Sequence, residues 1–325
     1  MKPFESLMAP RLEAFLEYRH KMGWDTKTSR SHLRIFDQYL KKREADWSSF
    51  TPSFFLEMRH DLNMSPRSVN HVINAARGFF KFLQRREDVD HNPLRDIPML
   101  KENATVPFIF SPEKTDQLLK ALHKRIRRKE RFFLTDMGIY MAIVLLARCG
   151  MRISEPLRLL RQHYRPDDGT LFIEKTKFKK NRLIPVPKAV MREMDNYLSV
   201  RKSLLPHDEN PYLLADIEHR PLKDYKVRSA FHRAVEDIGL KQARKVVGNM
   251  IFNSPVPHSL RHSFAINTLR HIKERGDSPK DALHILSAYL GHREYHYTSV
   301  YLKVASAKSR KNLLDYTFWQ EWKRK

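Results

Sequence analysis

Apolar side chains in the first hundred residues recur at the spacing of a helix. Leu12, Phe15 and Leu16 lie three and four positions apart, and the same spacing recurs from Leu33 to Leu40 and from Val69 to Leu83. This period places apolar groups along one face of an amphipathic helix. We therefore predict that this part of the chain folds as a small bundle of helices.

Short polar residues and prolines mark the expected starts of these helices. Thr28 or Ser29 is a candidate N-cap for the second helix, and a short helix is predicted from about Phe54 to Leu62. Ser65-Pro66 has the features of an N-cap followed by a proline in the first helical turn. The longest helix of the bundle is therefore predicted to begin there.

The helical pattern stops after about residue 88. Asn92-Pro93, Ile97-Pro98 and Val106-Pro107 follow one another closely. Clustered prolines among polar residues, without a period, are typical of a linker. We predict three segments, namely a helical domain over residues 1–100, a linker over 101–110 and a second domain over 111–325.

The second domain begins with a helical pattern again. Ser111-Pro112-Glu113 is typical of a helix start, and Ile139 to Leu146 is a continuous apolar run of the kind that fills a core. That helix is expected to end at Cys149-Gly150, and another is expected to start near Ile153. The core of this domain is therefore predicted to be helical.

A strand pattern follows further along the chain. Leu171 and Ile173 alternate with other side chains, and Leu183 to Val186 form a second short run after a basic segment. Two such runs predict an antiparallel strand pair. Because proline cannot donate to a ladder, Pro185 places the second strand at an edge. Helices are expected to resume near Lys188 and to continue, with loops, to the end.

The chain carries a large excess of positive charge. Its 61 Lys and Arg residues against 37 Asp and Glu residues give a formal net charge of +24. Such an excess favours a nucleic-acid partner, with a basic membrane-surface protein as the alternative. Basic residues interleaved along the N-terminal helices either contact duplex phosphates or form a solvated face, and we favour the first. The candidate DNA contacts are Arg30, Arg34, Arg67, Arg77 and Lys81.

Cysteine content and hydropathy indicate the compartment. Cys149 is the single cysteine, so a disulfide or a cysteine zinc site within one chain is excluded. The start of the chain has no apolar segment typical of a secretory signal. The apolar run from Ile139 to Ala147 is much shorter than the roughly 20 residues that span a bilayer. We expect a cytoplasmic protein, nucleoid-associated when bound to DNA, with no membrane partner.

Residues suited to phosphate chemistry gather toward the C-terminal end. Arg261 follows His258 by three positions, and His292 follows Leu290-Gly291 nine positions before Tyr301. Arginine offers a rigid fork of donors that matches phosphate oxygens. Histidine moves protons near neutral pH, and tyrosine can act as a nucleophile. Together these residues predict one site for a phosphate.

Two upstream segments complete the series. Arg152 lies in Gly150-Met-Arg-Ile-Ser-Glu155, and Lys177 lies in the basic stretch between the predicted strands. In this order the motifs resemble the tyrosine recombinase family of the phage integrase type. That family has an arginine in Gly-x-Arg-x-Ser-Glu, a hairpin lysine, His-x-x-Arg, Leu-Gly-His and then the nucleophilic tyrosine. The resemblance covers roughly residues 108–310, and the N-terminal bundle resembles the family's core-binding domain.

The resemblance implies a fold and an activity. The fold is mainly α, with an N-terminal helical core-binding bundle and a mainly helical catalytic domain with a small antiparallel β-sheet, forming a clamp around DNA. The implied enzyme is a site-specific recombinase that serves integration, excision or transposition of a mobile element. Its partners are double-stranded recombination sites and other copies of the chain in a synaptic tetramer. Metal, cofactor and ATP are not implied.

The resemblance also implies a role for each site residue. Tyr301 attacks the phosphate and forms a 3′-phosphotyrosyl link, while Arg152 and Arg261 hold the non-bridging oxygens. Lys177 protonates the leaving 5′-oxygen, and His258 assists proton transfer with Tyr301. The remaining roles are a hydrogen bond from His292 to a phosphoryl oxygen, a bracing contact by Glu155, and DNA contacts by Lys179, Lys180 and Arg182.

Several alternatives stay open. Tyr297 is the next candidate nucleophile, and other lysines share the segment of Lys177. The pairs His258/His262 and His292/His296 have the i, i+4 spacing of metal ligands, which would fit a metal-dependent hydrolase. A DNA-binding regulator without chemistry would explain the charge, and a type IB topoisomerase shares the phosphotyrosine chemistry. The segment of residues 240–256 is longer and more basic than the loop that the family usually has at this place.

Overall fold

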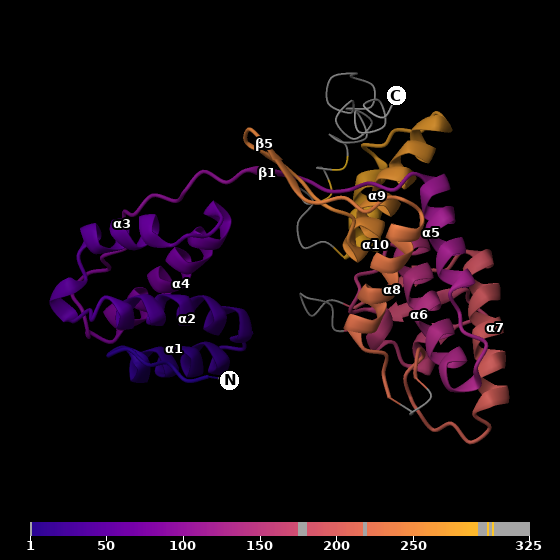
Figure 1. Cartoon of the computed structure of the whole chain (residues 1–325), viewed down its shortest axis with the longest axis horizontal. Helices are drawn as coiled ribbons and strands as arrows, with labels where there is room; N and C mark the ends of the chain where they lie inside the picture. The colour runs from indigo at the N-terminus through magenta and orange to yellow at the C-terminus, as the bar shows by residue number, and fades with distance from the viewer. Residues whose placement is uncertain (1, 175–180, 217–219, 292–297, 299–300, 302–325) are drawn as a thin grey trace. The chain divides into compact units, whose positions relative to one another are not determined.

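The computed structural model describes the chain except for residues 1, 175–180, 217–219, 292–297, 299–300 and 302–325 (Figure 1). The chain divides into two compact units, Met1–Ala104 and Thr105–Lys325. Each unit has its own apolar core. We describe each unit by itself.

The first unit is the predicted helical bundle. Its helices are α1 (Ala9–Lys21), α2 (Lys27–Lys42), α3 (Pro52–Asp61) and α4 (Pro66–Arg85). Buried aromatic rings from α1, α2, α3 and α4 meet in its core, with edge-to-face contacts among them. The phenylalanines in these contacts are Phe15, Phe36, Phe55, Phe79 and Phe80, all of them buried.

The starts of the helices follow side-chain capping. Ser65 accepts a hydrogen bond from the backbone N–H of Ser68, which confirms the predicted start of α4. The prediction of Thr28 or Ser29 as the cap of α2 was wrong, because the helix already begins at Lys27. Asp25 accepts a hydrogen bond from the Lys27 N–H at 2.9 Å, so an acidic residue ahead of the helix satisfies this donor.

The chain beyond α4 is tied back onto that helix. Arg77 donates to the carbonyl oxygens of Leu94 at 2.9 Å and Ile97 at 2.6 Å. Asn70 both donates to the carbonyl of Leu100 at 2.9 Å and accepts from its N–H at 2.8 Å. These polar side chains replace the hydrogen bonds that an irregular segment cannot make with itself.

The second unit is built around α6 (Glu130–Arg148), which is buried along most of its length. Around it pack α5 (Pro112–Lys124), α7 (Lys188–Leu204), α8 (Asp224–Asp237) and α9 (Pro257–Glu274) (Figure 1). The short helix α10 (Ala282–Leu290) packs on α9. Ser111 caps α5 by accepting from the Lys114 N–H, which confirms the predicted helix start. Among the described residues, no helix is long and apolar enough to cross a bilayer.

A small sheet contains the predicted strand pair. Its strands β2 (Tyr164–Arg165), β3 (Thr170–Ile173) and β4 (Arg182–Pro185) lie in the order β2-β3-β4 and are antiparallel. Ile173 faces Arg182, and Thr170 faces Pro185. The strand pair and the edge position of the proline-containing strand are therefore confirmed.

Two local predictions for this unit were wrong. Instead of a helix starting near Ile153, the chain makes a turn and then a 3₁₀ helix, Pro156–Arg158, because the Glu155 carboxylate accepts the Arg152 N–H and closes the turn. Residues 240–256, expected as a loop, contain the hairpin β5 (Lys245–Val247) and β6 (Met250–Phe252). This hairpin pairs with β1 (Ala104–Val106) in a second sheet, β1-β6-β5, seen beside the helices in Figure 1.

Candidate active site

The C-terminal end of α10 gathers three arginines. The last carbonyl groups of a helix have no partner within the helix, and they carry the negative end of its dipole. In this protein three successive carbonyls of α10 and its cap each accept from a different guanidinium. The pairs are Arg182 Nε to the Tyr289 oxygen at 2.8 Å, Arg261 Nη2 to the Leu290 oxygen, and Arg152 Nη2 to the Gly291 oxygen at 3.1 Å.

Glu155 is the buried counter-charge of this cluster. Its carboxylate accepts from Arg152 Nη1 at 3.0 Å and from the two terminal nitrogens of Arg182 at 3.1 and 2.9 Å. Burial acts to raise the pKa of Glu155, but the hydrogen bonds and charge of Arg182 outweigh it and hold that pKa below its usual value. The carboxylate is therefore ionised and locks two guanidiniums in place.

Arg261 is the most deeply placed of the three. Its side chain is almost fully buried, and Nη1 donates to the Gly150 carbonyl at 2.8 Å. Burial, followed by the nearby charge of Arg152, lowers the pKa of Arg261 to about 9. The guanidinium is still charged at neutral pH, but the surroundings disfavour that charge. An anion bound beside it would remove this penalty.

Two glycines allow this close packing. Gly150 has a φ of +59°, and a Cβ there would lie 2.5 Å from a ring carbon of Phe264. Gly291 has a φ of +64°, and a Cβ there would lie 3.2 Å from the Arg182 side chain. Residues with a side chain rarely adopt this left-handed backbone conformation. The two carbonyls that hold Arg261 and Arg152 thus come from positions that require glycine.

The first turns of α9 bring histidines to Tyr301. His262 Nδ1 lies 3.0 Å from the Tyr301 hydroxyl oxygen, and the ring of His258 lies edge to face with that of His262 at 4.6 Å between centroids. Tyr301 is 5% exposed. Burial raises the pKa of Tyr301, although Arg261 and Arg152 act to lower it. The nucleophile candidate is therefore a protonated phenol at neutral pH.

His258 is open to solvent on one side but borders the arginine cluster. Loss of solvent on its inner side, followed by the positive charges of Arg261 and Arg152, lowers the pKa of His258 to about 4. This imidazole is neutral near pH 7, and it would gain a proton more readily once an anion neutralised the arginines.

The described part of the chain brings together five of the seven residues that were predicted as catalytic or supporting. Arg152, Glu155, His258, Arg261 and Tyr301 surround one centre. Other predicted site residues lie outside the described residues, namely Lys177, Lys179, Lys180 and His292, together with the alternative nucleophile Tyr297.

Two residues have contacts that the sequence did not indicate. Arg182, predicted as a DNA contact, is mostly buried and donates to Glu155 and to the end of α10. His262 was considered only as a metal ligand, but it contacts Tyr301. The i, i+4 spacing of His258 and His262 was the available signal, since it places both on one helix face.

The metal-site alternative has little geometric basis in the described part of the chain. There, no three His, Cys, Asp or Glu side chains lie close enough to hold a metal ion together. The second histidine pair, His292 and His296, lies outside the described residues.

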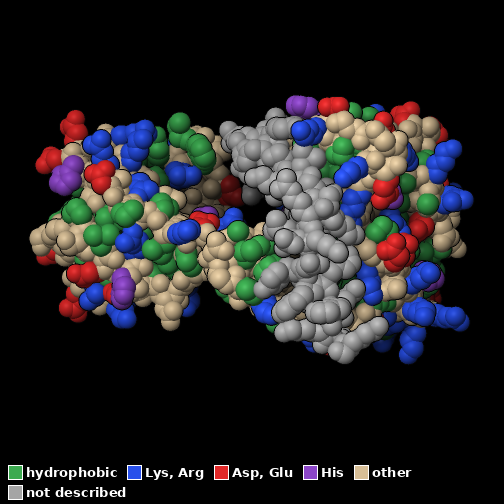
Figure 2. Space-filling view, turned by 90° about the horizontal axis from the view of Figure 1, so that it is seen from above, with side chains coloured by type: hydrophobic (Ala, Val, Ile, Leu, Met, Phe, Trp, Pro, Cys, Tyr) green, Lys and Arg blue, Asp and Glu red, His purple; other side chains and the backbone are tan. Residues whose placement is uncertain are grey.

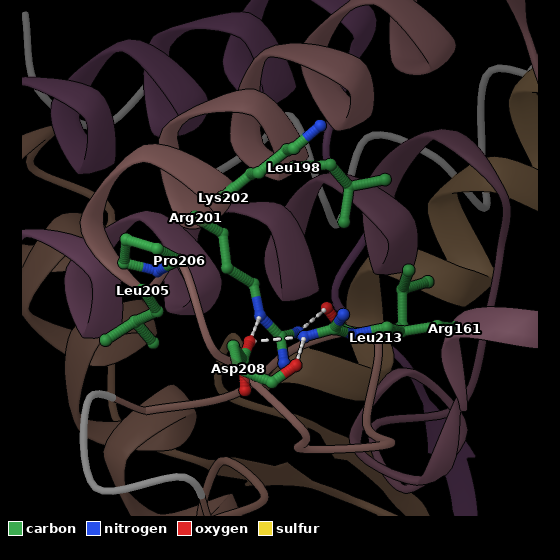
Figure 3. A pocket seen from close by; sticks show the side chains of 8 residues that line it. All are labelled: Arg161, Leu198, Arg201, Lys202, Leu205, Pro206, Asp208 and Leu213. Atoms are coloured by element: carbon green, nitrogen blue, oxygen red, sulfur yellow. Dashed lines mark hydrogen bonds and ion pairs between the residues drawn. The ribbon is translucent and has the colours of Figure 1, made fainter.

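A separate hollow of about 340 Å³ lies near the end of α7 (Figure 3). The buried Arg201 lines this hollow. Its guanidinium donates to Asp208 at 2.6 Å and to the carbonyls of Asn210, Tyr212 and Leu213. These bonds hold the loop after α7 in place. We therefore assign the hollow a structural role.

Comparison with known proteins identifies the class. A sequence profile of the phage integrase family matches residues 109–308, more than half of the chain. Tyrosine recombinase XerA of Pyrococcus furiosus is 26% identical over 317 residues, which are 96% of this chain and 97% of that relative. The chain belongs to the phage integrase family. It is a tyrosine recombinase, an enzyme that breaks and rejoins DNA strands.

Solved structures agree with this fold. The XerH recombinase bound to a palindromic difH substrate, in a post-cleavage complex, gives a TM-score of 0.72 at 17% identity, covering 96% of this chain and 99% of that one. A lambda integrase tetramer bound to a Holliday junction gives a TM-score of 0.61 at 17% identity, covering 88% of this chain and 77% of that one.

Proposed function

We propose that the chain carries out site-specific recombination with Tyr301 as its nucleophile. One observation carries the assignment. The hydroxyl of Tyr301 lies beside His262 of α9 and in the electrostatic field of both Arg152 and Arg261. A phosphate held by these guanidiniums would meet the phenol oxygen. The two arginines would then stabilise the charge that grows on the non-bridging oxygens as Tyr301 attacks.

Cleavage joins the DNA 3′-phosphate to Tyr301 and releases a 5′-hydroxyl. We assign protonation of the leaving oxygen to Lys177, assistance in proton transfer with Tyr301 to His258, and a hydrogen bond to the phosphoryl group to His292. Glu155 keeps Arg152 oriented, because it accepts from both the side chain and the backbone N–H of that residue. The phosphodiester energy is conserved in the protein–DNA link, so that a new 5′-hydroxyl can reverse the step.

The DNA partner is supported by the charge of both units. Lys and Arg side chains are spread over the face drawn in Figure 2. In the first unit, Arg67 and Lys81 are exposed on α4 and remain our candidates for phosphate contacts. Arg30 forms an ion pair with Glu13, and Arg77 holds backbone carbonyls, so both also serve the fold of this unit. Arg34 is half-buried on α2.

We further propose that the two units close as a clamp on duplex DNA and that copies of the chain assemble on paired sites as a tetramer. The lambda integrase tetramer on a Holliday junction supports this arrangement by similarity of fold. The biological reaction would be integration, excision or transposition of a mobile element, in the cytoplasm and at the nucleoid.

Covalent trapping tests the function. Wild type, Tyr301→Phe and Tyr297→Phe are incubated with EDTA and with nicked duplexes that carry sequences from the flanks of the gene, and products are run on denaturing gels. A protein–DNA band that only Tyr301→Phe abolishes is expected. Loss only in Tyr297→Phe would move the nucleophile. The absence of a band with DNA that wild type binds would favour a regulator without chemistry.

A further inference from the structure

We propose that His262 is a catalytic residue, which accepts the proton of Tyr301 during cleavage and returns it during rejoining. The inference rests on the proposed function of Tyr301. It gives the role of proton acceptor to a different histidine from His258, to which the sequence motif assigned it.

The contact that carries the inference is short and well placed. The Nδ1 atom of His262 lies 3.0 Å from the Tyr301 oxygen, which is within the range for direct proton transfer. The two rings are inclined by 60° with 5.7 Å between their centroids, so the contact is made through the polar atoms rather than by stacking. The acceptor therefore touches the reacting atom itself.

The helix α9 holds His262 in a fixed relation to the phosphate-binding arginine. His262 directly follows Arg261, whose guanidinium is anchored by the carbonyls of Gly150 and Leu290. Ser263, the next residue, is buried and bonded to the Ser259 carbonyl and the Phe110 N–H. A proton acceptor on such a braced turn does not have to be reoriented when DNA binds.

Tyr301 needs an acceptor, because burial raises the pKa of its phenol and leaves it protonated near pH 7. His258 is poorly suited to this purpose, because burial and the nearby charges of Arg261 and Arg152 lower its pKa to about 4. His258 instead lies edge to face on the His262 ring, where it can restrict the orientation of that imidazole.

The proposed step is balanced. The Tyr301 oxygen forms a bond to phosphorus as its proton moves to His262 Nδ1, and the bond from phosphorus to the 5′-oxygen breaks. The leaving oxygen takes a proton from a separate acid, which we assign to Lys177. In rejoining, the 5′-hydroxyl attacks phosphorus and gives its proton back to Lys177, the phosphotyrosyl bond breaks, and His262 returns its proton to the phenol oxygen.

The first test measures single-turnover cleavage of nicked duplexes that carry the flanking sequences of the gene. His262→Asn keeps a polar atom near the position of Nδ1 but cannot accept a proton, so cleavage is expected to slow by about 10²–10⁴-fold. His271→Asn is the matched control, because His271 is exposed on the same helix and pairs with Glu274. Its rate should equal that of wild type.

A fluorinated tyrosine at position 301 separates proton transfer from positioning. Fluorination lowers the phenol pKa, so a larger fraction of the nucleophile is ionised before attack and depends less on a base. The loss caused by His262→Asn should then shrink at least tenfold. An undiminished loss would show that His262 only positions the phenol, and an unchanged rate in His262→Asn would overturn the inference. Failure of wild type to form any adduct on DNA that it binds would instead refute the proposed function, and with it this inference.

A second test needs no DNA. The free protein is labelled with ¹⁵N-histidine. If His262 Nδ1 accepts a hydrogen bond from the Tyr301 hydroxyl, the neutral imidazole must carry its proton on Nε2. Long-range NMR correlation spectra report which nitrogen carries the proton. Tyr301→Phe should shift the His262 signals and leave those of His271 unchanged. A proton on Nδ1, or signals of His262 that do not respond to Tyr301→Phe, would overturn the proposal.

Discussion

Removal of the negative charge of Glu155 should lower the free energy of unfolding of the second unit by more than so small a change in the side chain would indicate. Glu155→Gln preserves the shape of the side chain but leaves Arg152 and Arg182 without their shared carboxylate. The nearby Arg261 is already in surroundings that lower its pKa to about 9. Three guanidiniums would then lie close together with only carbonyl oxygens to hold them.

The expected loss can be worked from the burial of this pair. The Glu155 side chain is 5% exposed and that of Arg182 is 9% exposed. Breaking a buried ion pair by removing one partner costs about 3–5 kcal/mol in the free energy of unfolding. For a unit of this size that corresponds to a fall in Tm of roughly 6–20 °C.

Thermal unfolding of wild type and Glu155→Gln is the assay, with Glu236→Gln as the control. Glu236 pairs with Lys241 on the surface, where both side chains are more than half exposed, so its loss should cost at most about 1 kcal/mol. Added phosphate should raise the Tm of Glu155→Gln more than that of wild type, because the anion replaces the missing charge. Chloride at equal ionic strength controls for screening.

The pH dependence gives a second check on Glu155. The pKa of Glu155 is lowered in the folded protein, so its contribution to stability is present above the unfolded pKa and is lost as pH falls through the folded one. The difference between wild type and Glu155→Gln should therefore shrink in acid. A stability difference below about 1 kcal/mol at pH 7 would refute the view that Glu155 balances the arginines.

Three further predictions test Gly150, His258 and the basic residues of α4. Gly150→Ala should cost about 2–5 kcal/mol in unfolding assays, because a clash adds to the strain of positive φ; Gly239→Ala, with positive φ but open space, should cost only about 1–2 kcal/mol. NMR titration of the free protein should give His258 a pKa of about 4, rising when DNA binds; a value near 6.5 in the free protein would contradict burial beside Arg261 and Arg152 as the cause of the shift. Lys81→Gln should reduce the salt dependence of DNA binding by about one unit of slope, whereas Arg77→Gln should lower the stability of the first unit by about 1–3 kcal/mol.

The helices and one sheet could be predicted because their signals are local. The apolar period of α4 and its Ser65 cap lie within a few residues of one another, and both were confirmed. The hairpin β5–β6 was missed because each strand has only three residues. So short a run shows little alternation, and pairing with β1 depends on a segment about 140 residues earlier in the chain.

The arrangement of the site could be predicted only in part. Arg152, Arg261 and Tyr301 could be identified from the sequence, because each is a residue type with its own chemistry and lies in a motif. Three of the carbonyl groups that hold the arginines belong to the backbone of α10 and its cap residue Gly291, and every residue has such a group. Their role depends on where the helix ends, and a motif does not show that.

Arg182 shows how the same residue type divides into different roles. It lies in a basic segment, as a DNA contact would, and its charge alone predicts attraction to phosphate. Pairing of β4 with β3 and the approach of α10 instead bury its guanidinium against Glu155. Arg182 thus connects β4 to Glu155, the carboxylate that orients Arg152. The predicted catalytic Lys177 precedes β4 in the chain. The cluster is therefore assembled from three arginines, of which two are proposed to hold the phosphate and the third, Arg182, holds Glu155 and the end of α10 together.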